Sequence, residues 1–175
     1  MASLSELARV YREEGRLSEA ESLTRQAIQT LEKAVGSEHP DLPPLWNNLA
    51  DVYQAQHRYA EAESHYRKAL ATNEKLLGPE HPDTGRIING LATLYFEQKN
   101  YAKAEGLYRR AIAIKEKALG PNHPAVATTL NNLGQIFLLE RRYADAEPLF
   151  QRALRIRETH LGKEHPDGSS SLSLK

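Results

Sequence analysis

The sequence Asn-Asn-Leu-Gly at residues 131–134 leads to Tyr-Ala-Asp-Ala-Glu at 143–147 and then to Leu-Gly-Lys-Glu-His-Pro at 161–166. Similar segments precede it at a fixed interval. The His-Pro pairs, for example, begin at residues 39, 81, 123 and 165, a constant step of 42 residues. A fixed period of roughly 20–50 residues is typical of solenoids, propellers and other repeat arrays. The period therefore predicts four repeats, at residues 1–36, 37–78, 79–120 and 121–162.

The composition argues against several classes of protein. The 23 Lys and Arg residues balance the 23 Asp and Glu residues, so the chain lacks the basic surface typical of nucleic-acid and anionic-membrane binders. There is no cysteine, which excludes disulfides and thiol chemistry. The N-terminus has no signal-peptide pattern, and no apolar run is long enough to span a bilayer. We expect a soluble, cytoplasmic protein that binds neither nucleic acid nor membrane.

Each repeat contains two apolar patterns with the helical spacing of i, i+3, i+4 and i+7. In residues 37–78 these patterns consist of Trp46, Leu49, Ala50 and Tyr53, and then of Ala62, Tyr66, Ala69 and Leu70. Small residues let two helices approach each other, and the large side chain of a neighbour fills the groove beside them. The sequence predicts two helices per repeat and an all-α fold.

Glycine and proline mark the expected ends of the helices. Gly36, Gly78, Gly120 and Gly162 follow the second helix of each repeat, where a residue in the left-handed conformation commonly ends a helix. The prolines at 40, 82, 124 and 166 suit the first position of the next helix, whose N–H has no intrahelical partner. Residues 163–175 begin this pattern once more and then become rich in serine, which predicts an aborted fifth repeat and a flexible tail.

The order of a large apolar residue, leucine, a small residue and an aromatic residue resembles the tetratricopeptide repeat (TPR), a helix–turn–helix unit of about 34 residues. Residues 46–53, Trp-Asn-Asn-Leu-Ala-Asp-Val-Tyr, fit this pattern closely. The period of 42 residues and the Asn-Asn-Leu and His-Pro signatures are similar to the long repeats of kinesin light chains, nephrocystin-like proteins and many bacterial sensor proteins. The resemblance implies a right-handed superhelix of four helix pairs, in which the first helix of each pair lines a concave groove.

The sequence departs from the family pattern at two places. The proline that ends the second helix of a 34-residue repeat is absent, and Glu74, Glu116 and Glu158 stand in its place, so we expect longer second helices. The glycine in the turn between the two helices survives only as Gly15. At the equivalent position the other repeats carry His57, Lys99 and Arg141. We expect these three turns to adopt a geometry that is open to residues with a side chain.

The family geometry also implies which residues face the groove. Asparagine is a poor helix former, so its recurrence at Asn47, Asn89 and Asn131 favours a role in holding the backbone of an extended peptide. The alternative is that such amides bond to neighbouring helices, which we prefer for Asn48 and Asn132. The other positions implied to face the groove are Arg9, Arg12, Asp51, Gln54, Arg86, Thr93, Phe96, Gln135 and Leu138.

These residues predict a non-catalytic scaffold that binds a short peptide, or the face of a partner protein, in its concave groove. The alternative is a structural, oligomerisation or sensor segment of a larger regulator, in which the ends of the array make the contacts. No nucleophile–base set, phosphate-binding glycine loop or isolated pair of carboxylates interrupts the repeats. We therefore expect neither an enzymatic activity nor a cofactor.

The histidines of the His-Pro pairs are candidate metal ligands, but a metal site needs three or four ligands that converge on one point. The array supplies one histidine per loop, and successive loops are a whole repeat apart. The start of the next helix is the better explanation of these pairs, and we expect no bound metal.

The last helix of the array, expected at residues 144–161, should present an apolar edge. Phe150, Ala153, Leu154 and Leu149 are predicted to face the place of a fifth repeat. Because repeat arrays need polar terminal faces to remain soluble, we expect this edge to be covered by the tail or to pack against another chain.

Overall fold

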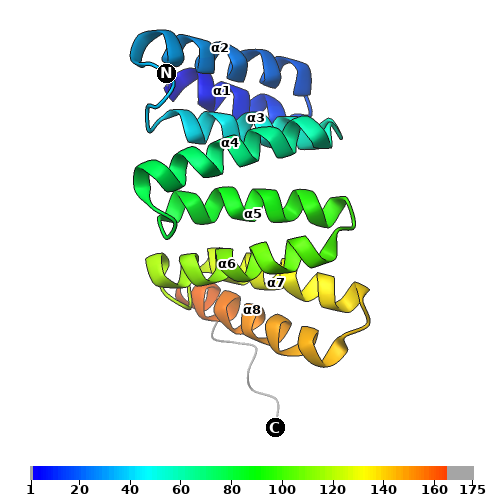
Figure 1. Cartoon of the computed structure of the whole chain (residues 1–175). Helices are drawn as coiled ribbons and strands as arrows, with labels where there is room; N and C mark the ends of the chain where they lie inside the picture. The colour runs from blue at the N-terminus through cyan, green and yellow to red at the C-terminus, as the bar shows by residue number, and fades with distance from the viewer. Residues whose placement is uncertain (1, 165–175) are drawn as a thin grey trace.

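The computed structural model describes residues 2–164, which form eight α-helices and no strands (Figure 1). The helices are α1 (Ala2–Glu13), α2 (Leu17–Val35), α3 (Leu42–Ala55), α4 (Tyr59–Leu77), α5 (Pro82–Glu97), α6 (Tyr101–Leu119), α7 (Pro124–Leu139) and α8 (Tyr143–Glu164). None of the described helices is both long and apolar enough to cross a membrane.

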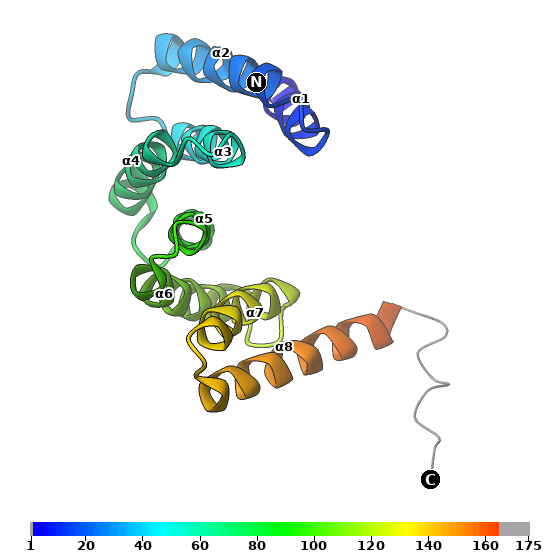
Figure 2. The ribbon, with the colours of Figure 1, turned by 90° about the vertical axis from the view of Figure 1, so that its right-hand side faces the viewer.

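The helices stack as four hairpins in one direction. α1 packs on α2, α3 on α4, α5 on α6 and α7 on α8, and the second helix of each hairpin packs on the first helix of the next. Figure 2 shows the resulting arc, with α3 and α5 on its inner side and α4 and α6 on its outer side. The predicted all-α repeat solenoid is confirmed.

Buried small residues recur at a fixed place in the second helices. Ala27, Ala69, Ala111 and Ala153 are all buried, at intervals of 42 residues. Large side chains, among them Trp46, fill the space beside these alanines in the core. The hairpins are therefore held together by the alternation of small and large residues that the sequence shows.

The turn inside each hairpin keeps one backbone conformation in all four repeats. Gly15 has a φ of 76°, and His57, Lys99 and Arg141 have φ values of 59°, 60° and 61°. In the second repeat the N–H of Arg58 donates to the carbonyl of Tyr53, and the N–H of His57 donates to that of Gln54. This is the Schellman arrangement, in which a left-handed residue ends the helix. Residues with a side chain can occupy this left-handed region, although less readily than glycine, so all four turns can share it.

The glycines between the hairpins adopt a different conformation from the one predicted. Gly36, Gly78 and Gly120 combine φ values of 85–95° with ψ values of 154–176°, an extended region that is accessible essentially to glycine alone. They are therefore not left-handed helical residues. Gly162 ends no helix, because α8 continues through it to Glu164.

Histidine begins two of the later hairpins. The Nδ1 atoms of His81 and His123 accept hydrogen bonds from the backbone N–H two residues further on, and Pro82 and Pro124 occupy the first helical position. In the second repeat α3 begins only at Leu42, so Pro40 lies before the helix. Pro43 and Pro44 lack the N–H groups that would extend the helical hydrogen bonds back to residues 39 and 40.

The lengths of the second helices agree with the prediction made from the missing proline. α2, α4 and α6 each have 19 residues, and Glu74 and Glu116 lie inside α4 and α6. The aborted repeat and tail were expected at residues 163–175. Lys163 and Glu164 belong to α8, and residues 165–175 lie outside the described residues.

The C-terminal edge differs from the prediction in two residues, Leu149 and Ala153, and Leu149 is half-buried against the core. Ala153 is buried, because it is one of the small residues that let the helices of its own hairpin approach, so it does not belong to this edge. Phe150 is half-buried, and its ring lies against Gly134 of the same hairpin. Leu154 is exposed. The edge predicted for self-association therefore consists of Leu154 and one side of Phe150.

Candidate functional site

The inner face of the arc contains a hollow of about 410 Å³ at the junction of the first three hairpins. Its lining comes from α1, α3, α4 and α5, so it lies on the side of the first helices (Figure 2). We call it the inner hollow. Its lining residues are Arg12, Asp51, Gln54, Ala55, Tyr66, Asn89, Gly90, Thr93 and Glu97.

A hydrogen-bonded network crosses the inner hollow and joins three repeats. Arg12 donates to Asp51 Oδ2 at 2.7 Å, and the Tyr66 hydroxyl donates to Asp51 Oδ1 at 2.5 Å. The same hydroxyl lies 2.9 Å from Gln54 Oε1, and Gln54 Nε2 donates to Glu97 Oε1 at 2.7 Å. The network fixes these polar groups on rigid helices, which is the arrangement that a specific binding surface needs.

The electrostatics of the inner hollow centre on Asp51. Burial raises the pKa of the Asp51 carboxyl above its usual range, although the hydrogen bonds from Tyr66 and Arg12 act in the opposite direction. Burial and the neighbouring Asp51 charge together raise the pKa of the Tyr66 hydroxyl. The tyrosine therefore remains protonated and continues to donate to Asp51 at every physiological pH.

Asn47 does not face the groove, contrary to the prediction. Its side chain is 3% exposed, and its Nδ2 lies 3.4 Å from Asp51 Oδ2. Its Oδ1 is buried without a hydrogen-bond partner among the described residues. Asn47 thus lies under the inner hollow and supports Asp51, so it cannot contact a ligand directly.

Asn89 lines the inner hollow, and its side-chain carbonyl oxygen already accepts two hydrogen bonds. Asn89 Oδ1 accepts from Lys115 Nζ at 3.2 Å and from the Thr129 hydroxyl at 2.9 Å. These contacts join α5 to α6 and α7. Only the Asn89 amide nitrogen, for which the described residues offer no hydrogen bond, remains available to a ligand.

Lys115 is a partly buried ammonium group with only neutral acceptors around it. Its Nζ contacts Asn89 Oδ1, Thr129 Oγ1 at 2.7 Å and the carbonyl of Ala125 at 3.4 Å. Because burial disfavours the charged form, it lowers the pKa of Lys115 to about 8. The charged lysine therefore destabilises the folded protein.

Replacement of Lys115 by methionine is expected to stabilise the protein at pH 7 by about 1 kcal/mol, after allowance for partial solvent exposure. A lysine pKa that is lower in the folded state makes the stability rise with pH between the folded and the unfolded pKa, because only the unfolded chain keeps the proton there. The advantage of Lys115→Met should therefore shrink from pH 8 to pH 10.5. Urea unfolding at pH 7 and at alkaline pH measures it.

The exposed Lys117 on the same helix provides the control. Lys117→Met should show no comparable change with pH. A Lys115→Met variant that is less stable than the parent at pH 7, with an unchanged pH profile, would show that the hydrogen bonds of Lys115 outweigh its desolvation.

The remaining predicted residues do not line the inner hollow. Arg9 is exposed and bonds to Glu6 and Glu13 on its own helix, at 3.2 and 2.9 Å. Phe96 is half-buried against Tyr101, with ring centroids 5.8 Å apart. The others are the exposed Arg86, Gln135 and Leu138 and the half-buried Asn131.

Sequence reasoning missed four of the lining residues, namely Ala55, Tyr66, Gly90 and Glu97. Tyr66 was assigned to the core by its helical spacing, and only its hydroxyl reaches the network. Gly90 occurs at the position where the neighbouring repeats have Asn48 and Asn132. A Cβ atom at Gly90 would lie 2.7 Å from the Tyr66 ring, so the glycine makes room for the tyrosine. That break in the pattern was the available signal.

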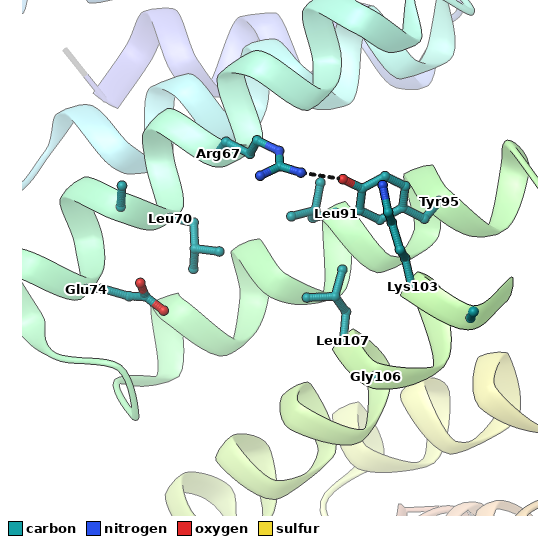
Figure 3. A pocket seen from close by; sticks show the side chains of 10 residues that line it. Arg67, Leu70, Glu74, Leu91, Tyr95, Lys103, Gly106 and Leu107 are labelled. Atoms are coloured by element: carbon teal, nitrogen blue, oxygen red, sulfur yellow. Dashed lines mark hydrogen bonds between the residues drawn. The ribbon is translucent and has the colours of Figure 1, made fainter. Parts of the chain in front are cut away.

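A second hollow, of about 610 Å³, lies between α4 and α6 above the side chains of Leu91 and Tyr95 from α5 (Figure 3). We call it the outer hollow. Arg67 donates to the Tyr95 hydroxyl at 2.9 Å, and Lys103 lies over the Tyr95 ring. Gly106 leaves open space at its rim.

Within residues 2–164, no three His, Cys, Asp or Glu side chains are grouped so that they could hold a metal ion. The histidines of the first three His-Pro pairs, His39, His81 and His123, accept hydrogen bonds from the backbone N–H two residues further on, at 3.1–3.3 Å.

The sequence profile of the tetratricopeptide repeat family matches residues 41–117 and 87–159, and a second profile of the same family matches residues 1–41. The chain belongs to the tetratricopeptide repeat family. A search among proteins with curated functions finds no match.

Solved structures of kinesin-light-chain-like proteins are similar to this TPR array. BtubC (BKLC) from P. vanneervenii is 28% identical with a TM-score of 0.80, over 98% of this chain and 68% of that one. A putative kinesin light chain with nearly identical TPR-like repeats from Podosopora anserina is 29% identical with a TM-score of 0.79, over 94% of this chain and 78% of that one. The repeats are of the kinesin-light-chain-like type.

The Rap protein, solved in complex with Competence and Sporulation Factor, shares the fold at a lower level of identity. It is 18% identical with a TM-score of 0.77, over 87% of this chain and 41% of the Rap chain.

Proposed function

We propose that this TPR array is a protein-interaction scaffold whose inner face binds an extended segment of a partner polypeptide. The observation that carries the proposal is the inner hollow, where three repeats contribute hydrogen-bonding side chains to one recess of about 410 Å³. An extended peptide has unpaired backbone N–H and C=O groups, which such side chains can satisfy.

The polar groups of the inner hollow offer both donors and acceptors. Arg12 and the Asn89 amide nitrogen can donate to peptide carbonyls, whereas Gln54, Thr93 and Glu97 can accept from peptide N–H groups. Because the network already holds Arg12, Gln54 and Glu97 in place, a peptide would order few side chains on binding.

Two apolar side chains extend this surface along the inner face. Phe96 on α5 and Leu138 on α7 are 42 residues apart and occupy equivalent positions in neighbouring repeats. Leu138 is exposed and Phe96 is half-buried. They would supply apolar contacts for side chains of the bound segment, since a few such anchors usually dominate the binding free energy.

The test is selection of linear peptides from a random library on the full chain, followed by calorimetric titration of the selected peptides. Gln54→Ala and Thr93→Val should each weaken binding about tenfold, because a lost interaction of roughly 1.4 kcal/mol has that effect. Both side chains are half-exposed, so the variants should keep the fold.

Lys103→Ala on the outer hollow is the matched control and should leave the affinity unchanged. Selected peptides whose affinity falls with Lys103→Ala, and not with Gln54→Ala or Thr93→Val, would place the binding surface on the outer side and refute the proposal for the inner face.

A further inference from the structure

The first hairpin exposes apolar side chains at two positions. The equivalent side chains in every other hairpin are buried. Leu7 is 40% exposed, whereas Leu49, Leu91 and Leu133, at intervals of 42 residues, are at most 4% exposed. Val10 is 39% exposed, whereas its equivalents Val52, Leu94 and Ile136 are at most 2% exposed. Leu7 and Val10 together form what we call the N-terminal edge.

Inside the array, these positions contact the preceding hairpin. Leu91 shares the outer hollow with Leu70 of α4, and Val52 shares a small recess with Ala8 and Thr24 of the first hairpin. The N-terminal edge therefore has the chemistry of a junction between hairpins, and no other hairpin among residues 2–164 packs on it.

The last hairpin exposes the opposite half of the same junction. Leu154 is 57% exposed, whereas at the equivalent position Ile28 and Ile112 are at most 9% exposed and Leu70 is half-buried. Phe150 is half-buried, whereas its equivalents Tyr66 and Tyr108 are both buried. Leu154 and Phe150 together form the C-terminal edge.

All three internal junctions contain ion pairs, and one kind of pair recurs at two of them. Arg58 at the start of α4 donates to Glu21 of α2 at 2.9 Å, and Arg142 at the start of α8 donates to Glu105 of α6 at 3.1 Å. The equivalents at the two edges are Arg16 and Glu147.

Each of these edge residues bonds only within its own hairpin. Arg16 pairs with Glu14 and Glu19, and Glu147 accepts a hydrogen bond from Gln151. A guanidinium at one edge and a carboxylate at the other thus repeat the charge pattern of the internal junctions.

We propose that a second copy of this chain docks its N-terminal edge on the C-terminal edge of the first, so that α1 of one copy packs on α8 of the other. Such a contact would repeat the packing of α2 on α3, α4 on α5 and α6 on α7. Arg16 of one copy would then pair with Glu147 of the other. The contact is heterologous, because it joins two different edges, and successive copies would extend the superhelix without closing a ring.

This inference is independent of the proposed function, because neither edge includes a residue of the inner hollow. Head-to-tail association would leave the inner face open and continue it across the junction. A partner segment could then contact hairpins from two copies.

The test is sedimentation velocity of the full chain over a wide range of concentrations, together with two single-edge variants. Val10→Glu blocks the N-terminal edge, and Leu154→Glu blocks the C-terminal edge. Both side chains are exposed, so each variant should keep the helical circular dichroism of the parent. The parent should form oligomers that grow with concentration, and each variant alone should associate at least about tenfold more weakly.

An equimolar mixture of the two variants should form dimers and nothing larger. The free C-terminal edge of Val10→Glu can dock on the free N-terminal edge of Leu154→Glu, and the two blocked edges prevent further growth. A parent chain that remains a monomer at every concentration would overturn the proposal. Self-association of Val10→Glu alone that is as strong as that of the parent would overturn it too, because the N-terminal edge would then not be needed for the contact.

The absence of cysteine from the chain permits a second measurement. Arg16→Cys and Glu147→Cys, mixed in equal amounts and treated with a short bifunctional thiol reagent, should give mainly mixed cross-links. Cross-links mainly between two identical variants would contradict a head-to-tail junction.

Discussion

Replacement of Trp46 by alanine is expected to lower the free energy of unfolding by about 4 kcal/mol, because truncation of a buried aromatic side chain leaves a large cavity. Trp46 is only 2% exposed and belongs to the continuous core. The Nζ atom of Lys68 on α4 lies 3.8 Å from its ring centroid, so the substitution also removes a cation–π contact between α3 and α4.

Urea unfolding followed by circular dichroism measures this loss, since Trp46 is the only tryptophan and its removal abolishes tryptophan fluorescence. Leu138→Ala on the exposed inner face is the control and should change stability by no more than about 0.5 kcal/mol. A loss below about 1 kcal/mol for Trp46→Ala would show that the hairpins can close around the cavity.

The position of Trp46 also predicts where the variant protein opens first. A repeat array is stabilised mainly by contacts between neighbouring repeats, so damage in the second hairpin should weaken the first two hairpins more than the last two. Hydrogen exchange should therefore accelerate in α1–α4 before α5–α8. Uniform acceleration over the described helices would indicate that the array unfolds as one cooperative unit.

The fold could be predicted because its information is repeated along the sequence. The constant step of 42 residues and the alternation of Ala with Leu or Tyr are both local patterns, and each occurs several times. Errors in reading one repeat are corrected by the others. The helix pairs and the all-α class followed from this redundancy, whereas the inner position of the first helices was implied by the family resemblance.

The candidate site was less predictable because it depends on differences between the repeats. Asn47, Asn89 and Asn131 are equivalent in sequence, yet Asn47 is buried beneath Asp51 and Asn89 accepts a hydrogen bond from Lys115. A lysine occurs at that position only in the third repeat, since the equivalent residues are Leu31, Asn73 and Arg157. A sequence pattern that treats the repeats as identical cannot predict such contacts with side chains of other helices.

The turns inside the hairpins could be predicted only in part, for a related reason. The residue at each turn indicates only that the geometry must admit a side chain, whereas the packing of the flanking helices makes it left-handed. The hydrogen bonds of the Schellman motif and the burial of Tyr53 and Tyr95 on the preceding helices hold the turn in place even where the residue has a side chain. His57, Lys99 and Arg141 are therefore held in a conformation that they would not choose in isolation.

Replacement of these three residues by glycine is expected to stabilise the protein by about 2 kcal/mol in total. A left-handed conformation costs a residue with a Cβ atom about 1–2 kcal/mol, and the greater flexibility of glycine in the unfolded chain offsets about 0.5–1 kcal/mol of that gain at each site. The gain should be largest at Lys99 and Arg141, which make no side-chain hydrogen bonds to the described residues. It should be smaller at His57, whose Nδ1 lies 2.9 Å from the Tyr59 hydroxyl.

Thermal and urea unfolding of His57→Gly, Lys99→Gly, Arg141→Gly and the triple variant would measure these gains, which should add because the sites are in different hairpins. Gly15→Ala is the matched control: it introduces a side chain at the fourth turn, where φ is 76° and no atom lies within 4 Å of the new Cβ. With no clash to relieve, only backbone strain can act, so Gly15→Ala should be destabilising by about 1 kcal/mol. The glycine variants could prove neutral while Gly15→Ala remains destabilising. In that case contacts of the side chains at the other three turns would offset the cost of the left-handed conformation, and these turns would hold no net strain.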